Sequence, residues 1–229
     1  MAFTMQMIET AARSLLQTLA NSDLSTIRVA LVGEPAVAHY TAGRGEIALH
    51  SLQILVEYGP TGLPDNVSGS IALNCKASLL RTAPNTFGQG DTWGDNMVVT
   101  ALGLPVKFIE AGMDRFTTGM TLTPLSQMDV RPMGRLPYAR PDEILFEKVW
   151  QCSFIPSELL RQTTEAAEDL IESARSVQSR LDHHHPLILS PVQRDAIDAG
   201  FLRLLVRTEV PENTWRALFG LFVVIRELY

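Results

Sequence analysis

Four consecutive side chains near the C-terminus, Asp182-His183-His184-His185, have the chemistry of metal ligands. Imidazole and carboxylate groups bind zinc, nickel or copper, so a metal-dependent hydrolase that uses these four residues is one hypothesis for the function. Neighbouring residues, however, point about 100° apart on a helix and to opposite faces of a strand. A consecutive run therefore rarely coordinates a single ion. We interpret it as a solvated loop between two helices and expect neither a metal site nor a cofactor.

A glycine-rich segment, Phe87–Gly94, has some likeness to a phosphate-binding loop. Its spacing is G-x-G-x-x-x-G, one residue longer than the dinucleotide fingerprint, and no Walker-type lysine follows it. The chain also lacks the G-x-S-x-G elbow of serine hydrolases, and Cys152 lies on the apolar side of its predicted element, as a small core residue would. These patterns predict no catalytic residue, and we expect a protein that is not an enzyme.

A basic and aromatic stretch lies between two predicted strands, with Arg131, Arg135 and Arg140 interleaved with Tyr138. Guanidinium groups and a stacking ring could contact the acidic side chains of a neighbouring protein, or phosphates. The alternatives are a solvated loop and an adaptor that uses this stretch on nucleic acid. We predict that these four residues contact a partner.

A nine-residue apolar run, Ala217–Ile225, is flanked by Arg216 and Arg226 near the end of the chain. It is too short to span a bilayer and too apolar for one exposed face of a helix. Either the helix is buried within its own domain or its outer side contacts another subunit. In the second case the contact residues are Leu218, Phe219 and Phe222.

The composition limits the classes of function. The chain has 229 residues with 46% apolar and 19% charged side chains, which is typical of a globular protein. A net charge of −6 argues against broad binding of nucleic acid through charge alone. Two cysteines cannot form a disulfide framework. No charged leader followed by an apolar stretch opens the sequence, and no apolar run is long enough to cross a membrane, so neither secretion by a signal peptide nor membrane attachment is expected.

Glycine and proline divide the chain into two parts. Residues 1–156 hold 13 of the 15 glycines and 10 of the 13 prolines. Because both residues interrupt helices, the first part is predicted to be sheet and loop and the second part, 157–229, to be helical. The fold class predicted is α+β, with an N-terminal helix on a small mixed or antiparallel sheet with long loops, followed by a helical C-terminal region.

The positions of apolar residues predict the individual elements. Residues 81–143 hold only short apolar pieces between glycines and prolines, and long loops are expected there. The predicted strand Glu46–Tyr58 has one polar residue, Gln53, in its apolar centre. The helices are predicted at Met5–Ala20, Ser157–Leu181, Pro191–Arg207 and Thr214–Leu228, and the strands at Thr26–Val32, Glu46–Tyr58, Ile71–Leu80 and Ile144–Ile155.

The order of these elements resembles that of the tail-terminator and sheath-cap proteins of phage tails and contractile injection systems. An amphipathic helix comes first, followed by a strand, a loop and the strand Ile47–Gly59. A closing strand ends at Trp150–Ile155 after long loops. The resemblance implies a structural subunit that forms a symmetric ring, of six copies in that group, and acts through surfaces rather than through a catalytic set. The partners expected are further copies of the chain and other structural subunits of a particle, in a virion or in a cytoplasmic assembly. Nucleic acid is expected only inside such a ring.

Overall fold

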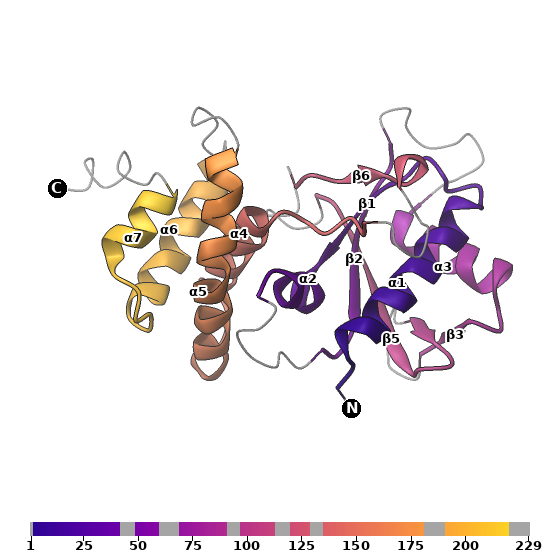
Figure 1. Ribbon diagram of the computed structural model, residues 1–229, viewed down its shortest axis with the longest axis horizontal. Coiled ribbons are helices and arrows are strands. Elements are labelled where there is room, and N and C mark those ends of the chain that lie inside the picture. The colour runs from indigo at the N-terminus through magenta and orange to yellow at the C-terminus, as the bar shows by residue number, and fades with distance from the viewer. Residues whose placement is uncertain are drawn as a thin grey trace. The chain divides into compact units, whose positions relative to one another are not determined.

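The computed structural model describes residues 2–41, 49–59, 69–90, 97–112, 120–128, 135–180 and 191–219. The chain divides into two compact units, Met1–Ala139 and Arg140–Tyr229. The first unit holds all the described strands and the second is helical, so the α+β class predicted from the sequence is confirmed (Figure 1). None of the described helices combines the length and the hydropathy that a membrane span requires.

The first helix, α1 (Met5–Ala20), begins as the sequence predicts. Thr4 caps it, since its Oγ1 accepts a hydrogen bond of 3.3 Å from the backbone N–H of Met7. Its buried residues recur at helical spacing and form one stripe, so the helix is stabilised mainly by packing this stripe on the sheet. They are Ile8, Ala11, Ala12, Leu15, Leu16 and Leu19.

Six strands form one mixed sheet in the order β3-β4-β5-β2-β1-β6. At its centre β1 and β2 are antiparallel, whereas β2 and β5 are parallel. The outer edge of β1 is covered by β6 and by the segment around Tyr138, where Leu31 N–H donates to the Pro137 carbonyl at 2.7 Å. The strands are β1 Arg28–Val32, β2 Leu52–Glu57, β3 Phe87–Gln89, β4 Met97–Val99, β5 Leu104–Glu110 and β6 Thr123–Pro124, the last followed by the 3₁₀ turn η1 Leu125–Gln127.

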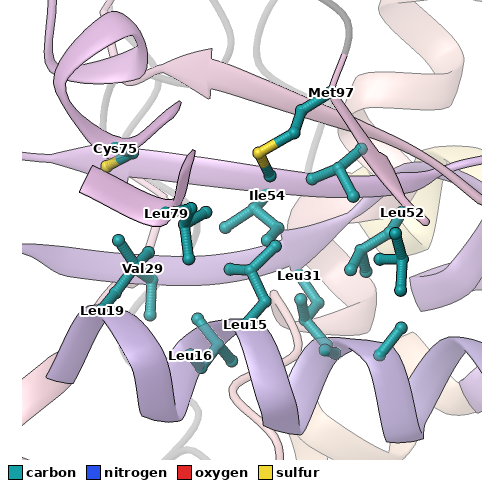
Figure 2. Packing of buried hydrophobic residues seen from close by; sticks show 14 of the residues in the cluster. Leu15, Leu16, Leu19, Val29, Leu31, Leu52, Ile54, Cys75, Leu79 and Met97 are labelled. Atoms are coloured by element: carbon teal, nitrogen blue, oxygen red, sulfur yellow. The ribbon is translucent and has the colours of Figure 1, made fainter. Parts of the chain in front are cut away.

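The two faces of this sheet carry different helices (Figure 1). On one face α1 and α3 (Ile71–Thr82) cover the main core, where leucines of α1 meet alternate residues of the strands (Figure 2). The short helix α2 (Gly33–Tyr40) follows β1 directly and contacts β1 and β2. Side chains that alternate with the core residues along β1, β2 and β5 belong to the other face, which we call the second face. Labelled core residues in Figure 2 include Leu15, Leu19, Val29, Leu31, Leu52, Ile54, Cys75, Leu79 and Met97.

The prediction of a strand at Ile71–Leu80 is wrong, because this segment is the helix α3. Alternation of Ile71, Leu73 and Cys75 suggested a strand, yet Leu73 is 50% exposed while Ile71, Cys75, Ser78 and Leu79 are buried, at helical spacing. The helix begins at Ser70, whose Oγ accepts a hydrogen bond from Leu73 N–H. The Glu110 carboxylate strengthens this start by accepting from the N–H of Ala72 at 3.1 Å and from the Ser70 hydroxyl.

The prediction of a strand at Ile144–Ile155 is also wrong, because residues Pro141–Gln151 form the helix α4. Pro141 is its first residue, and the Glu143 side chain accepts a hydrogen bond of 3.0 Å from Arg140 N–H. Both features are typical of a helix start. Since α4 packs against α5 (Ser157–Arg180) and α6 (Pro191–Leu205), the second unit begins at Arg140 rather than near Pro156.

The helices predicted for the C-terminal part are confirmed in the described residues as α5, α6 and α7 (Glu212–Phe219). Leu160, Ala167 and Ala174, which recur every seven residues along α5, are buried. Gly200 of α6 lies so close to α4 that an added Cβ would overlap the carbonyl oxygen of Val149. The fully buried Trp215 of α7 donates from Nε1 to the Thr208 hydroxyl at 3.1 Å.

Candidate functional site

Three side chains of the second face lie side by side where β1 passes into α2. Val32 of β1 is the register partner of Gln53 on β2, and Gln53 is the register partner of Lys107 on β5. Register partners point to the same face of a sheet, with strands about 4.8 Å apart. We call Val32, Gln53 and Lys107 the second-face row. It places an amide and an ammonium group next to each other at one end of the sheet.

Gln53 is held against the start of α2. Gly33 has a φ of +68°, a conformation that side chains rarely allow, and a Cβ at this position would lie only 2.5–2.9 Å from the Gln53 side-chain amide. The absence of a side chain at Gly33 therefore makes room for the amide of Gln53. Gln53 Nε2 in turn donates to the Ser51 hydroxyl at 3.4 Å. Backbone and side chain together fix the amide beside the α2 start.

Lys107 carries the positive charge of the row. Its neighbour Val106 is buried in the core, whereas Lys107 is exposed on the second face. Among the residues that the structure describes, no carboxylate forms an ion pair with Lys107. An exposed ammonium group beside an amide can bind an anion, because lysine supplies a point charge and three donors, while the glutamine Nε2 has a second N–H donor besides the one that it gives to Ser51.

A second cluster of polar groups lies at the other end of α2. The imidazole of His39 stacks on the ring of Tyr138, with ring centroids 3.9 Å apart and planes inclined by 13°, and Tyr40 contacts both rings edge-on. The Tyr138 hydroxyl donates to Glu9 Oε1 of α1 at 3.0 Å. This cluster joins α1, α2 and the segment before Ala139 within the first unit.

Burial sets the protonation of this cluster. Desolvation lowers the pKa of His39, opposed by the Glu9 carboxylate and aided by the Arg135 guanidinium. Desolvation also raises the pKa of Tyr138, and the charge of Glu9 and the hydrogen bond to it raise this pKa further. His39 is therefore neutral and Tyr138 remains a hydrogen-bond donor at neutral pH. The arrangement cross-links α1, α2 and the segment before Ala139.

The structure separates the residues of the predicted basic and aromatic contact stretch. Arg135 and Tyr138 come together at His39, where Arg135 is exposed and Tyr138 is half-buried. Arg140 instead belongs to the second unit, where its Nε donates to Asp142 at 3.0 Å just before α4. Arg131 lies outside the described residues. Contact of these residues with a partner stays a prediction.

The other candidate residues are placed in part. Leu218 is buried on α7, with 7% of its surface exposed. Phe222 and the run Asp182–His185 lie outside the described residues, and of Phe219 only the backbone is described. Within the described ranges no three histidine, cysteine, aspartate or glutamate side chains gather as metal ligands would. Contact of Leu218, Phe219 and Phe222 with another subunit stays a prediction.

The residues of the second-face row were not selected from the sequence. Gln53 was the one visible signal, as a polar side chain in the apolar centre of its strand. Lys107 fell within a segment expected to be loop, and Gly33 directly follows the predicted strand Thr26–Val32. The parallel pairing of β2 with β5 places Gln53 next to Lys107, 54 residues away in the sequence. No local sequence pattern predicts this pairing.

Comparison with known proteins shows a likeness in fold. No protein-family model matches the sequence, and no curated protein matches it. The structure is similar to that of an antigenic nucleotidyltransferase-like protein from Paracoccidioides brasiliensis, with a TM-score of 0.54 and 14% identity. The match covers 87% of this chain and 95% of that one, which is more than the 139 residues of the first unit, so the likeness extends into both units.

This likeness overturns three expectations. The resemblance to tail-terminator and sheath-cap proteins is wrong, because the fold matches a nucleotidyltransferase-like protein and nothing in the comparison indicates a phage component. The function inferred from it, a ring-forming structural subunit, and the alternative of a metal-dependent hydrolase built on Asp182–His185 lose their support in the same way. The expectation that the protein is not an enzyme is contradicted by the same match. The element order misled at its end, because the segment expected to hold the closing strand forms the helix α4. At 14% identity, the likeness is one of fold.

Proposed function

We propose that the first unit binds a nucleoside triphosphate, and that the protein acts in nucleotidyl transfer. The observation that carries this proposal is the second-face row: an exposed ammonium and a fixed amide share one face of the sheet beside the start of α2. The likeness to a nucleotidyltransferase-like protein supports the choice of ligand, since the donor of a nucleotidyl group is a nucleoside triphosphate.

The chemistry of the row suits a triphosphate better than a neutral ligand. A triphosphate carries several negative charges, and a lysine ammonium offers a compact positive charge that can contact more than one phosphate oxygen. The Gln53 amide can donate to the same group, because Gly33 keeps its side chain close to the second face. Farther along this face Ala30 and Leu55 are buried and apolar, and beyond them Glu57 is paired with Arg28 at 3.2 Å, so among the described residues of the strands the unpaired positive charge of this face lies at the row.

Equilibrium binding tests the proposal directly. The full chain is titrated with ATP, GTP, CTP and UTP, and with adenosine as a ligand that lacks phosphate. We expect saturable binding of at least one triphosphate and much weaker binding of the nucleoside, because the phosphates make the contacts with Lys107. A protein that binds none of the four triphosphates, or binds adenosine as tightly as ATP, contradicts the proposal. Release of pyrophosphate in the presence of an acceptor then measures transfer.

A further inference from the structure

Transfer of nucleotidyl and phosphoryl groups commonly uses magnesium ions that bridge the phosphates and are held by one or two protein carboxylates. Whether this chain can hold such an ion depends on which carboxylates reach the second-face row. Within the described part of the first unit, Glu34, Glu57 and Glu110 lie on elements that adjoin the row. Each of the three has another role in the structure.

Glu57 and Glu110 are excluded by position. Glu57 lies on the second face but four residues along β2 from Gln53, about 13 Å away at the rise of a strand, and it pairs with Arg28 at 3.2 Å. Glu110 is the register partner of the core residue Val56, so it points to the opposite face, where it accepts from the start of α3. Neither carboxylate can share an ion with Gln53.

Glu34 is nearer, in the first turn of α2, and its Oε2 accepts a hydrogen bond of 3.1 Å from His50 N–H. The polar groups of the row near Glu34 are the amide of Gln53 and the ammonium of Lys107, and neither is a carboxylate. The ammonium of Lys107 repels a divalent cation, and glutamine is a weaker ligand for magnesium than a carboxylate. The described residues around the row therefore do not fit a magnesium site.

We infer that the second-face row binds the triphosphate directly, with Lys107 in the place that a divalent cation would otherwise fill, so that nucleotide binding does not require a metal. This inference rests on the proposed function, since it concerns the same ligand at the same row. In this arrangement Lys107 neutralises phosphate charge, and Gln53 donates a hydrogen bond to a phosphate oxygen.

Binding of ATP to the full chain is compared in excess EDTA and in excess magnesium chloride. We expect the dissociation constant for ATP in EDTA to be within about threefold of that in magnesium, or lower. It can be lower because magnesium neutralises the phosphate charge that Lys107 recognises. Binding only in magnesium overturns the inference and leaves the proposed function standing. Binding in neither condition overturns the proposed function itself.

The variant Lys107→Asp places a carboxylate in the row at an exposed position. In EDTA it should bind ATP at least tenfold more weakly than the wild type, and magnesium should restore part of the affinity, since the new carboxylate can hold the ion. Lys76→Asp makes the same change of charge on α3, which covers the other face of the sheet. It should bind ATP in EDTA as the wild type does. Equal loss in both variants, or no loss in Lys107→Asp, contradicts direct binding by Lys107.

Discussion

Gln53 and Lys107 are register partners on the parallel strands β2 and β5, although 54 residues separate them in the sequence. Their side chains lie on the face of the sheet opposite the main core, at the end where β1 passes into α2. An amide and an ammonium group are thereby held side by side on a rigid element. Sites on strands are positioned more accurately than sites on loops, so this pair is well suited to bind a charged ligand.

Replacing Lys107 by alanine should weaken binding of a nucleoside triphosphate about 10- to 100-fold. A hydrogen bond to a charged group contributes about 1.5–3 kcal/mol, and each 1.4 kcal/mol is a factor of ten in affinity. Because Lys107 is exposed, the free energy of unfolding of the variant should stay within about 0.5 kcal/mol of the wild-type value. Isothermal titration with ATP measures the change. Lys76→Ala serves as the control, and equal affinities for the two variants would remove Lys107 from the site.

Gly33→Ala should destabilise the protein, because residue 33 has a φ of +68° and a Cβ there would overlap the Gln53 amide. The left-handed conformation alone costs about 1–2 kcal/mol for a residue with a side chain. In the double variant Gly33→Ala with Gln53→Ala the overlap is removed and only the conformational cost remains, so the two effects should not add. Denaturant unfolding of the wild type and the three variants measures the coupling. Additive losses would show that the two residues do not constrain each other.

Acidification should destabilise the folded chain through His39. Burial lowers the pKa of His39 below its ordinary value of 6.5, so the unfolded chain binds this proton more tightly than the folded chain does. The free energy of unfolding therefore decreases as the pH falls through about 6.5 towards the lower folded pKa, and is fully recovered above 6.5. The variant His39→Phe keeps a ring against Tyr138 and should show a smaller decrease between pH 7.5 and 5.5.

The dependence of unfolding on pH is measured for the wild type and for His39→Phe under the same conditions. If His39→Phe and the wild type instead lose the same free energy on acidification, His39 does not carry the effect. Denaturant unfolding at a series of pH values decides between these outcomes.

Gly200→Ala should destabilise the second unit even though alanine favours helices. The change improves helix propensity by up to about 1 kcal/mol, yet the new Cβ overlaps the Val149 carbonyl oxygen where α6 meets α4. Overpacking of this kind costs about 1–3 kcal/mol, and backbone atoms cannot rotate away as a side chain can. Ala199→Gly, at an exposed neighbouring position, measures the propensity effect alone. A thermal midpoint for Gly200→Ala equal to or above that of the wild type would contradict the close approach of α4 and α6.

The sequence predicted those elements whose local pattern agrees with their packing. The stripe of α1 has a helical period that burial confirms, and the strand predicted around Val29 and Leu31 is confirmed as β1, although Ala30 and Val32 are buried as well. Prediction was wrong at α3 and α4, where apolar residues at alternate positions coincided with helical burial. The helix starts at Ser70 and at Arg140–Glu143 were the better signals, because capping groups identify a helix independently of its periodicity.

The candidate site could be predicted only to a small extent. Gln53 stood out as polar in an apolar strand, but its meaning depends on Gly33 and Lys107, which the sheet topology brings to it. Tyr138 and Arg135 were singled out for contact with a partner, whereas the structure places Tyr138 against His39 and Glu9 within the first unit. Long-range strand pairing determines both arrangements, and a local sequence pattern contains no information on it.

Mapping the bound nucleotide on the chain tests the central claim most directly. Backbone and side-chain amide resonances of the labelled protein are followed by NMR as ATP is added. The account predicts that the largest shifts occur at Gln53, Lys107 and Gly33 and that resonances of the second unit change little. Saturable binding with shifts confined to residues 140–229, or no shift at Gln53 and Lys107, would contradict it.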